Sequence, residues 1–139
     1  MTPGELERAR LVREAMFALI AALIDGGAPP AGARETVTAA AARPGPRPAL
    51  DEHGRVHRTG GLDAVLAHLA AEVVTLHDSP DRTRLRWCAD ARCTRPFVDR
   101  SHGQARRWCG MKGCGDRAKA AAYRRRHRPP SPSQPQTPA

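Results

Sequence analysis

Aromatic side chains are scarce in this sequence of 139 residues, which has two Trp, two Phe and one Tyr. Burial of large apolar side chains is the main source of stability in small proteins, so the buried area per residue should be modest. The length fits one or two small domains and excludes a large multidomain enzyme. We therefore expect a small hydrophobic core and a further source of stability.

Long apolar runs are absent as well. The longest one, residues 15–24, has ten residues, about half of the ~20 that a membrane-spanning helix needs. No basic segment precedes an apolar stretch at the N-terminus, so no secretory signal is expected. The sequence predicts a cytoplasmic protein without a membrane partner.

Acidic residues are rare in the C-terminal part, and lysine is rare throughout, since 21 of the 23 basic residues are arginine. Residues 1–81 hold eight Arg and eleven acids, a net charge of −3. Residues 82–139 hold 15 basic residues and three acids, a net charge of +12. A guanidinium can donate two hydrogen bonds to one phosphate, so this basic part favours a nucleic-acid partner.

The N-terminal part predicts three helices and a hairpin. Residues 3–25 follow a Thr2–Glu5 capping box and end at Gly26, residues 31–43 are stopped by proline, and residues 62–76 form a further helix. The expected buried faces hold Val12, Met16, Leu19, Ile20 and Leu23 in the first helix and Leu62, Val65, Leu66, Leu69, Val73 and Leu76 in the last. Residues 49–56 predict a short hairpin that would need a helix to lie on.

Cysteine is absent from the first 87 residues, and all four cysteines then follow within 27 residues. Two pairs, each separated by four residues, place four thiolates in two tight turns, which is the ligand set of a structural zinc site. We predict one zinc per chain, bound by Cys88, Cys93, Cys109 and Cys114. Disulfides are the alternative, and a cytoplasmic location disfavours them.

The residues around the cysteines predict a finger. Strands are expected at residues 84–87 and 96–98, a turn at 101–104, a returning strand at 106–108, and a helix that ends at 127. A knuckle, a hairpin and a helix with the second cysteine pair at its start make a treble-clef-like or ribbon-like zinc finger with four cysteine ligands. The predicted fold is mainly α, with a helical domain at 1–81, a small α+β finger with an Arg-rich helix at 82–128, and a disordered Pro-rich tail at 129–139.

The finger resembles the CGNR zinc finger over residues 84–126. The matching segments are Cys88-Ala89-Asp90-Ala91-Arg92-Cys93, Pro96-Phe97-Val98-Asp99-Arg100-Ser101, Arg106-Arg107-Trp108-Cys109-Gly110-Met111 and Cys114-Gly115-Asp116-Arg117-Ala118-Lys119 with Tyr123-Arg124. Asp116 stands where the family has Asn, and His102-Gly103 replaces an Arg-Asn-Gly-like turn. Both departures leave the metal ligands intact, but a carboxylate at position 116 would repel phosphate.

The preceding residues are similar to the second half of the ABATE domain of bacterial stress-induced transcription regulators. The features that match are Pro29-Pro30, the hairpin at 50–57 and the helix at 62–76. The region that usually opens this domain has no counterpart before the first helix, so we expect a shortened version. The resemblance implies a zinc-dependent bacterial regulator that binds DNA.

The candidate nucleic-acid contacts are basic residues of the finger. They are Arg106, Arg107, Arg117, Lys119, Arg124, Arg125, Arg126 and Arg128. We expect DNA ahead of RNA, because Trp87 and Trp108 adjoin cysteines and should belong to the finger core, which leaves Tyr123 as the one candidate for base stacking. A homodimer through residues 1–81 is also expected, since one finger is too small to specify a site.

Two alternatives use the same residues differently. In one, the zinc is purely architectural and the chain is a protein-interaction adaptor; in the other, the finger binds RNA. An enzyme is not expected, because four cysteines leave no zinc position for water and the sequence has no Ser/His/Asp or paired-carboxylate arrangement. The histidines at 53, 57, 68 and 77 are expected at the surface or in local hydrogen bonds.

Overall fold

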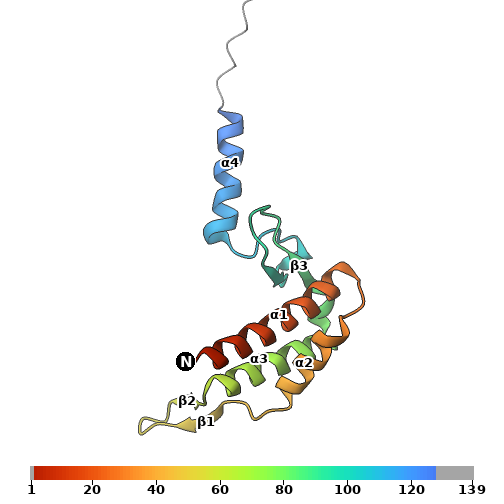
Figure 1. Cartoon of the computed structure of the whole chain (residues 1–139). Coiled ribbons are helices and arrows are strands. Elements are labelled where there is room, and N and C mark those ends of the chain that lie inside the picture. The colour runs from red at the N-terminus through yellow and green to blue at the C-terminus, as the bar shows by residue number, and fades with distance from the viewer. Residues whose placement is uncertain (1, 128–139) are drawn as a thin grey trace, which may run out of the picture.

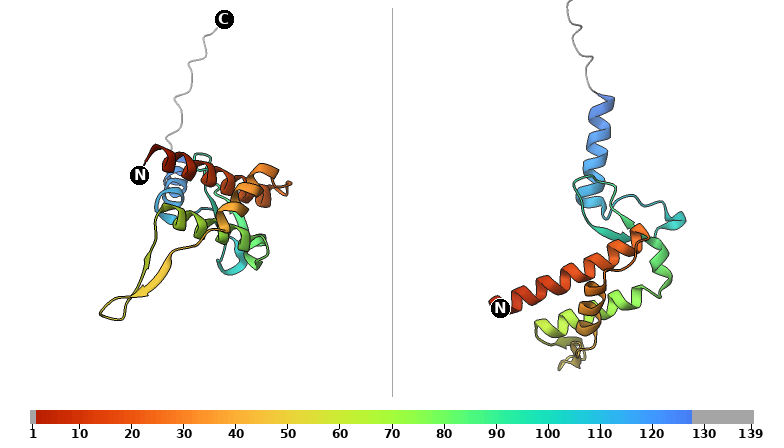
Figure 2. Two further views of the ribbon diagram at one scale, coloured as in Figure 1. Left: turned by 60° about the horizontal axis from the view of Figure 1, so that its bottom comes forward. Right: turned by 45° about the vertical axis from the view of Figure 1, so that its right-hand side comes forward.

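A computed structural model describes residues 2–127, which form four α-helices and two small antiparallel sheets (Figures 1 and 2). The helical region, residues 2–79, contains α1 (Pro3–Asp25), α2 (Ala31–Ala41), β1 (Arg47–Leu50), β2 (Val56–Thr59) and α3 (Leu62–Leu76). The finger, residues 84–127, contains β3 (Leu85–Trp87), β4 (Pro96–Val98), the short turns η2 (His102–Gln104) and η3 (Met111–Gly115), and α4 (Asp116–Arg126). The turn η1 (Pro80–Arg84) joins them. The mainly α fold with a small α+β finger is confirmed, while the predicted tail lies outside the described residues.

The first helix begins and ends where the sequence predicts. The Thr2 hydroxyl accepts a hydrogen bond from the Glu5 N–H at 3.2 Å, and the Glu5 carboxylate accepts one from the Thr2 N–H at 2.6 Å. These two bonds satisfy backbone donors that a helix start leaves free. Gly26 ends the helix at φ 69°, a left-handed conformation that glycine adopts without strain.

The core lies where α1, α2 and α3 pack together. Its buried residues are Val12, Ala15, Leu19, Val37, Ala40, Leu66, Ala70 and Val73. Val37 of α2 is completely buried, so the short middle helix contributes a central residue. The predicted face of α3 is partly wrong, because Val65 and Leu69 are each 44% exposed. Ala67 and Ala70 are buried in their place, since small side chains allow the neighbouring helices to approach α3 closely.

The hairpin of β1 and β2 projects away from the helices (Figure 2). The predicted hairpin forms, and every residue of both strands is exposed, so it lacks the supporting helix that we expected such short strands to need. Its turn is held by the Asp51 carboxylate, which accepts hydrogen bonds from the backbone N–H groups of Arg55 at 2.8 Å and His53 at 2.9 Å. These bonds hold the pKa of Asp51 below its usual value, against partial desolvation. The turn therefore closes through local polar contacts.

The finger joins the helical region at the C-terminal end of α1. The indole N–H of Trp87 donates to the Asp25 carboxylate at 2.8 Å, and the Trp87 ring lies 5.7 Å from the Phe17 ring. Trp87 thus packs on α1, which corrects the prediction that it belongs to the finger core. On the other side of the join, the Arg100 guanidinium donates to the Asp81 carboxylate of η1 at 3.1 Å. Within residues 2–127, no helix has the length and apolar character needed to cross a membrane.

One predicted strand of the finger is missing. β3 pairs with β4 from Leu85↔Val98 to Trp87↔Pro96, but residues 106–108 form no strand. The Arg106 N–H donates to the Asp99 carboxylate at 2.9 Å, and the Arg107 carbonyl accepts from the Ala89 N–H at 2.8 Å. Because these backbone groups bond to a buried side chain and to the first cysteine turn, they are not available to a sheet.

Candidate metal centre and nucleic-acid interface

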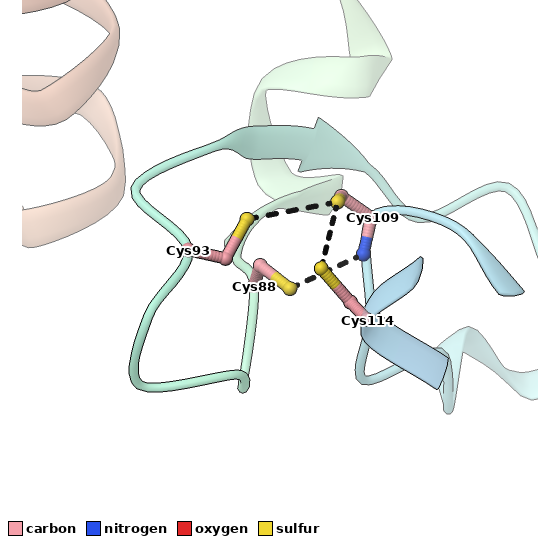
Figure 3. Close-up of side chains that lie close together, drawn as sticks. All are labelled: Cys88, Cys93, Cys109 and Cys114. Atoms are coloured by element: carbon pink, nitrogen blue, oxygen red, sulfur yellow. Dashed lines mark hydrogen bonds between the residues drawn. The ribbon is translucent and has the colours of Figure 1, made fainter. Parts of the chain in front are cut away.

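The fold brings all four cysteines together at the base of α4 (Figure 3). Cys88 follows β3 and Cys93 precedes β4, so the first pair flanks the turn of the finger hairpin. Cys109 precedes η3, and Cys114 lies within it, directly before α4. The four sulfur atoms lie within 4.8 Å of one another, and the Cys93–Cys109 and Cys109–Cys114 sulfur distances are both 3.8 Å.

These distances match a tetrahedral zinc site and exclude disulfides. A Zn–S bond of about 2.3 Å gives sulfur–sulfur edges of about 3.8 Å in a tetrahedron. A disulfide would require a separation of about 2.05 Å, and the four cysteines are free. Four sulfur donors are a set that zinc prefers, and they leave no position for a water molecule. One structural zinc per chain therefore fits Cys88, Cys93, Cys109 and Cys114, and the predicted cofactor is confirmed.

The four thiols differ in their pKa values in the absence of a metal. Burial and the neighbouring thiols raise the pKa of Cys114 to about 12, and burial raises the pKa of Cys109 as well. Burial acts in the same direction on Cys88, but N–H donors from Asp90 and Cys109 outweigh it and lower its pKa to about 7. Four thiolates so close together would repel each other strongly in the absence of a metal. Zinc coordination removes the protons and compensates part of the charge.

Arg117 links the metal site to the first cysteine turn. Its guanidinium donates to the Cys114 sulfur at 3.0 Å and to the Asp90 carboxylate at 2.7 Å. Asp90 also accepts from the Arg92 N–H at 3.1 Å, and these bonds hold its pKa below the usual value. Arg117 is thus a donor to a metal ligand, and its contact with nucleic acid stays a prediction.

Asp99 organises the segment that leads to the second cysteine pair. It is fully buried, and its carboxylate accepts hydrogen bonds from the Ser101 hydroxyl at 2.6 Å, the Ser101 N–H at 2.9 Å and the Arg106 N–H at 2.9 Å. The Ser101 hydroxyl, with these N–H groups, holds the pKa of Asp99 below its usual value despite burial. We did not single out Asp99 or Asp90 from the sequence. The Asp-x-Ser spacing at 99–101 is the available signal, since Asp often bonds to backbone two residues on.

The two candidate arginines before Cys109, Arg106 and Arg107, differ in the contacts that their side chains make. Arg106 donates to the carbonyl of Trp108 at 2.7 Å and to that of Cys109, and its guanidinium lies 5.1 Å from the centre of the Phe97 ring. Arg106 therefore holds the loop that carries Cys109. Arg107 is exposed, and its guanidinium lies 5.3 Å from the Trp108 ring.

The other described candidates lie on α4, which extends from the metal site away from the helical region (Figure 1). Lys119, Arg124, Arg125 and Arg126 are exposed, and no ion pair joins them to an acidic side chain within residues 2–127. Asp116 is also exposed. It lies in the first turn of α4, where a carboxylate interacts favourably with the helix dipole. Tyr123 stacks on His127 with ring centres 4.1 Å apart. Arg128 lies outside the described residues.

Two family profiles together cover almost the whole of the described chain. The profile of ABATE, a family described as a putative stress-induced transcription regulator, matches residues 1–80. The chain belongs to the ABATE family. The profile of the CGNR zinc finger matches residues 84–127, which include all four cysteines. No curated protein matches the chain. The chain is therefore a zinc-binding member of the ABATE family, with an ABATE region followed by a CGNR finger.

Proposed function

We propose that this ABATE-family chain is a DNA-binding transcription regulator whose CGNR finger makes the contact with the nucleic acid. The cluster of cations on α4 carries the proposal. Lys119, Arg124, Arg125 and Arg126 extend into solvent from a helix that is fixed at one end by the metal site. A rigid helix with unpaired cations suits electrostatic contact with phosphates.

The surroundings of the aromatic residues favour duplex DNA over single-stranded RNA as the target. Recognition of unpaired bases relies on exposed aromatic rings on which the bases stack. Trp87 packs against Phe17 and Asp25, Arg107 lies over the Trp108 ring, and Tyr123 stacks on His127. These contacts occupy the aromatic rings of the finger on at least one side, whereas the cations of α4 are free to meet a DNA backbone.

We also propose that the chain is not an enzyme and that it acts in the cytoplasm. The four cysteine sulfur atoms would occupy every position of a tetrahedral zinc ion, so the metal could not activate water. The zinc would then hold the finger in shape, and binding would be its contribution to function.

A homodimer through the ABATE region is the third part of the proposal. An apolar groove of about 430 Å³ lies between α1 and α3, with Phe17 40% and Leu69 44% exposed. A second copy covering this groove would place two fingers on one DNA, which increases both the contact area and the specificity. Leu69→Glu should then give a monomer, and light scattering of the full chain at several concentrations measures this.

Salt-dependent binding of the full, zinc-loaded chain to mixed-sequence duplex DNA tests the main proposal. If the finger neutralises about 4 to 6 phosphates, log K should fall against log salt with a slope of roughly −4 to −5. Replacement of Arg124, Arg125 and Arg126 by Ala should flatten this slope by up to about 3 units. Tighter binding to single-stranded RNA would make RNA the target. An absence of any salt-dependent binding would favour the protein-interaction adaptor.

A further inference from the structure

A groove of about 580 Å³ runs between α4 and the first cysteine turn of the finger. Basic side chains of Arg92, Arg107, Lys119 and Arg125 line this groove. Small or apolar residues also line it: Ala89, Ala91, Ala118, Ala121, Ala122 and Trp108. Arg92 was not among the candidates that we named from the sequence, because nothing in the sequence places it opposite α4.

The groove is strongly positive. Its lining includes five basic residues and one acid, a formal net charge of +4. The acid is Asp90, and its carboxylate is already paired with Arg117 at 2.6 Å. Asp90 also lies 3.8 Å from the Arg92 guanidinium, so Arg107, Lys119 and Arg125 are the groove cations without an ion-pair partner among the described residues. An anion that enters meets four cations and no free carboxylate.

Three separate segments build the groove, and the metal site holds them together. The first cysteine turn contributes residues 89–92, the loop before Cys109 contributes residues 107–108, and α4 contributes the rest. The Ala89 N–H donates to the Arg107 carbonyl at 2.8 Å, and Arg117 bridges α4 to Asp90. Each segment is adjacent to at least one cysteine of the zinc site. The groove should therefore exist only in the metal-bound finger.

The alanine residues that line the groove offer no hydrogen-bond donor or acceptor to a base edge, so they cannot make the bidentate contacts by which most bases are distinguished. Phosphate contacts require only positive charge, and they position a protein on nucleic acid without sequence information. Five of the α4 residues that line the groove recur on one side of the helix, at 117, 118, 121, 122 and 125, and Lys119 also lines it. Arg124 and Arg126 do not line it.

We propose that this groove binds the phosphate backbone of the nucleic acid, with Arg92 of the first cysteine turn and Arg125 of α4 contacting phosphates from opposite walls. This inference rests on the proposed function. It assigns the contacts that α4 makes with nucleic acid to two sides of the helix. The groove side anchors the backbone independently of sequence. Any reading of sequence by α4 comes from the side chains outside the groove.

Single substitutions on the two walls test the proposal. Arg92→Ala and Arg125→Ala are each compared with the unchanged chain and with Arg95→Ala, which removes an exposed finger arginine that does not line the groove. Binding to two mixed-sequence duplexes of unrelated sequence is measured over a range of salt concentrations. Each groove variant should weaken binding to both duplexes by the same factor and reduce the slope of log K against log salt by about 0.9.

Conservative variants and measurements of zinc content distinguish the loss of a phosphate contact from damage to the fold. Arg92→Lys and Arg125→Lys keep a positive charge and should retain the salt slope of the unchanged chain. All variants should contain one zinc per chain, because neither arginine donates to a cysteine sulfur. If the full chain binds duplex DNA but both alanine variants behave like Arg95→Ala, the groove proposal is wrong and the proposed function stands. If the full chain binds no nucleic acid, both are wrong.

Discussion

The ABATE region and the CGNR finger are stabilised in different ways. Eight buried apolar residues from three helices form the core of the ABATE region. In the finger, the buried residues other than cysteine and glycine are Leu85 and the charged Asp99. The finger replaces an apolar core with four thiols, a buried carboxylate and two arginines that bond to backbone or sulfur. A small chain with few aromatic residues can therefore form two folded regions, because only the ABATE region depends on burial of apolar side chains.

Removal of the metal should have the most different effects on the stability of the two regions. Zinc binding in such fingers contributes roughly 10 to 16 kcal/mol, so a strong chelator or Cys109→Ser should unfold residues 84–127 and leave α1, α2 and α3 intact. NMR spectra should lose the dispersed amide signals of the finger and keep those of the helical core. Addition of zinc should restore the finger in the chelated protein but not in Cys109→Ser. A finger that stays folded without metal would contradict the conclusion that the metal site, rather than an apolar core, stabilises it.

The converse experiment weakens the apolar core. Leu19 is only 4% exposed within the core of the ABATE region, so Leu19→Ala should lower the free energy of unfolding of this region by about 2 to 5 kcal/mol. The zinc content of the chain should not change. Leu11→Ala is the control on the same helix, because Leu11 is 58% exposed. Thermal unfolding followed by circular dichroism measures the first effect, and zinc released to a chromogenic chelator measures the second.

Arg117→Ala tests whether an arginine of α4 supports the metal site. Loss of a group that bonds to a metal ligand typically weakens metal binding by about 10- to 100-fold. Arg117 donates to the Cys114 sulfur, so we expect a loss of zinc affinity in this range in competition with a chelator of known affinity. Arg124→Ala, on the same helix but without such a bond, should leave zinc affinity unchanged. Equal zinc affinities for the two variants would show that Arg117 does not support the site.

The smallest expected effect lies at the join between the two regions. Asp25→Ala removes the acceptor of the Trp87 indole N–H, a bond of 2.8 Å. A hydrogen bond to a charged group contributes about 1.5 to 3 kcal/mol when buried, but this one is exposed, so the loss should be about 1 kcal/mol or less. Trp87 fluorescence should shift to longer wavelength as the indole becomes more solvated. Glu7→Ala, an exposed acid of the same helix, is the control.

Much of the fold is predictable because it depends on local signals. The Thr2–Glu5 capping box, Gly26 and the cysteine spacing each act within a few residues, so the sequence alone locates the ends of α1 and the four metal ligands. The buried face of α3 is not local, because it depends on which neighbours cover the helix. The periodicity of apolar residues therefore predicted Val65 and Leu69 as buried, whereas the structure leaves both exposed.

The sequence by itself determined that this protein has helices followed by a basic finger with a four-cysteine metal site, since composition, periodicity and spacing are enough for each. Only the tertiary structure decided what the individual charges do. Arg117 and Arg106 look like Arg124 in the sequence, yet they bond to Cys114, Asp90 and backbone carbonyls, while Arg124 remains in solvent. The physical reason is that a guanidinium binds whichever acceptor the fold brings near it, and residues as distant as 90 and 117 meet only after the finger has folded.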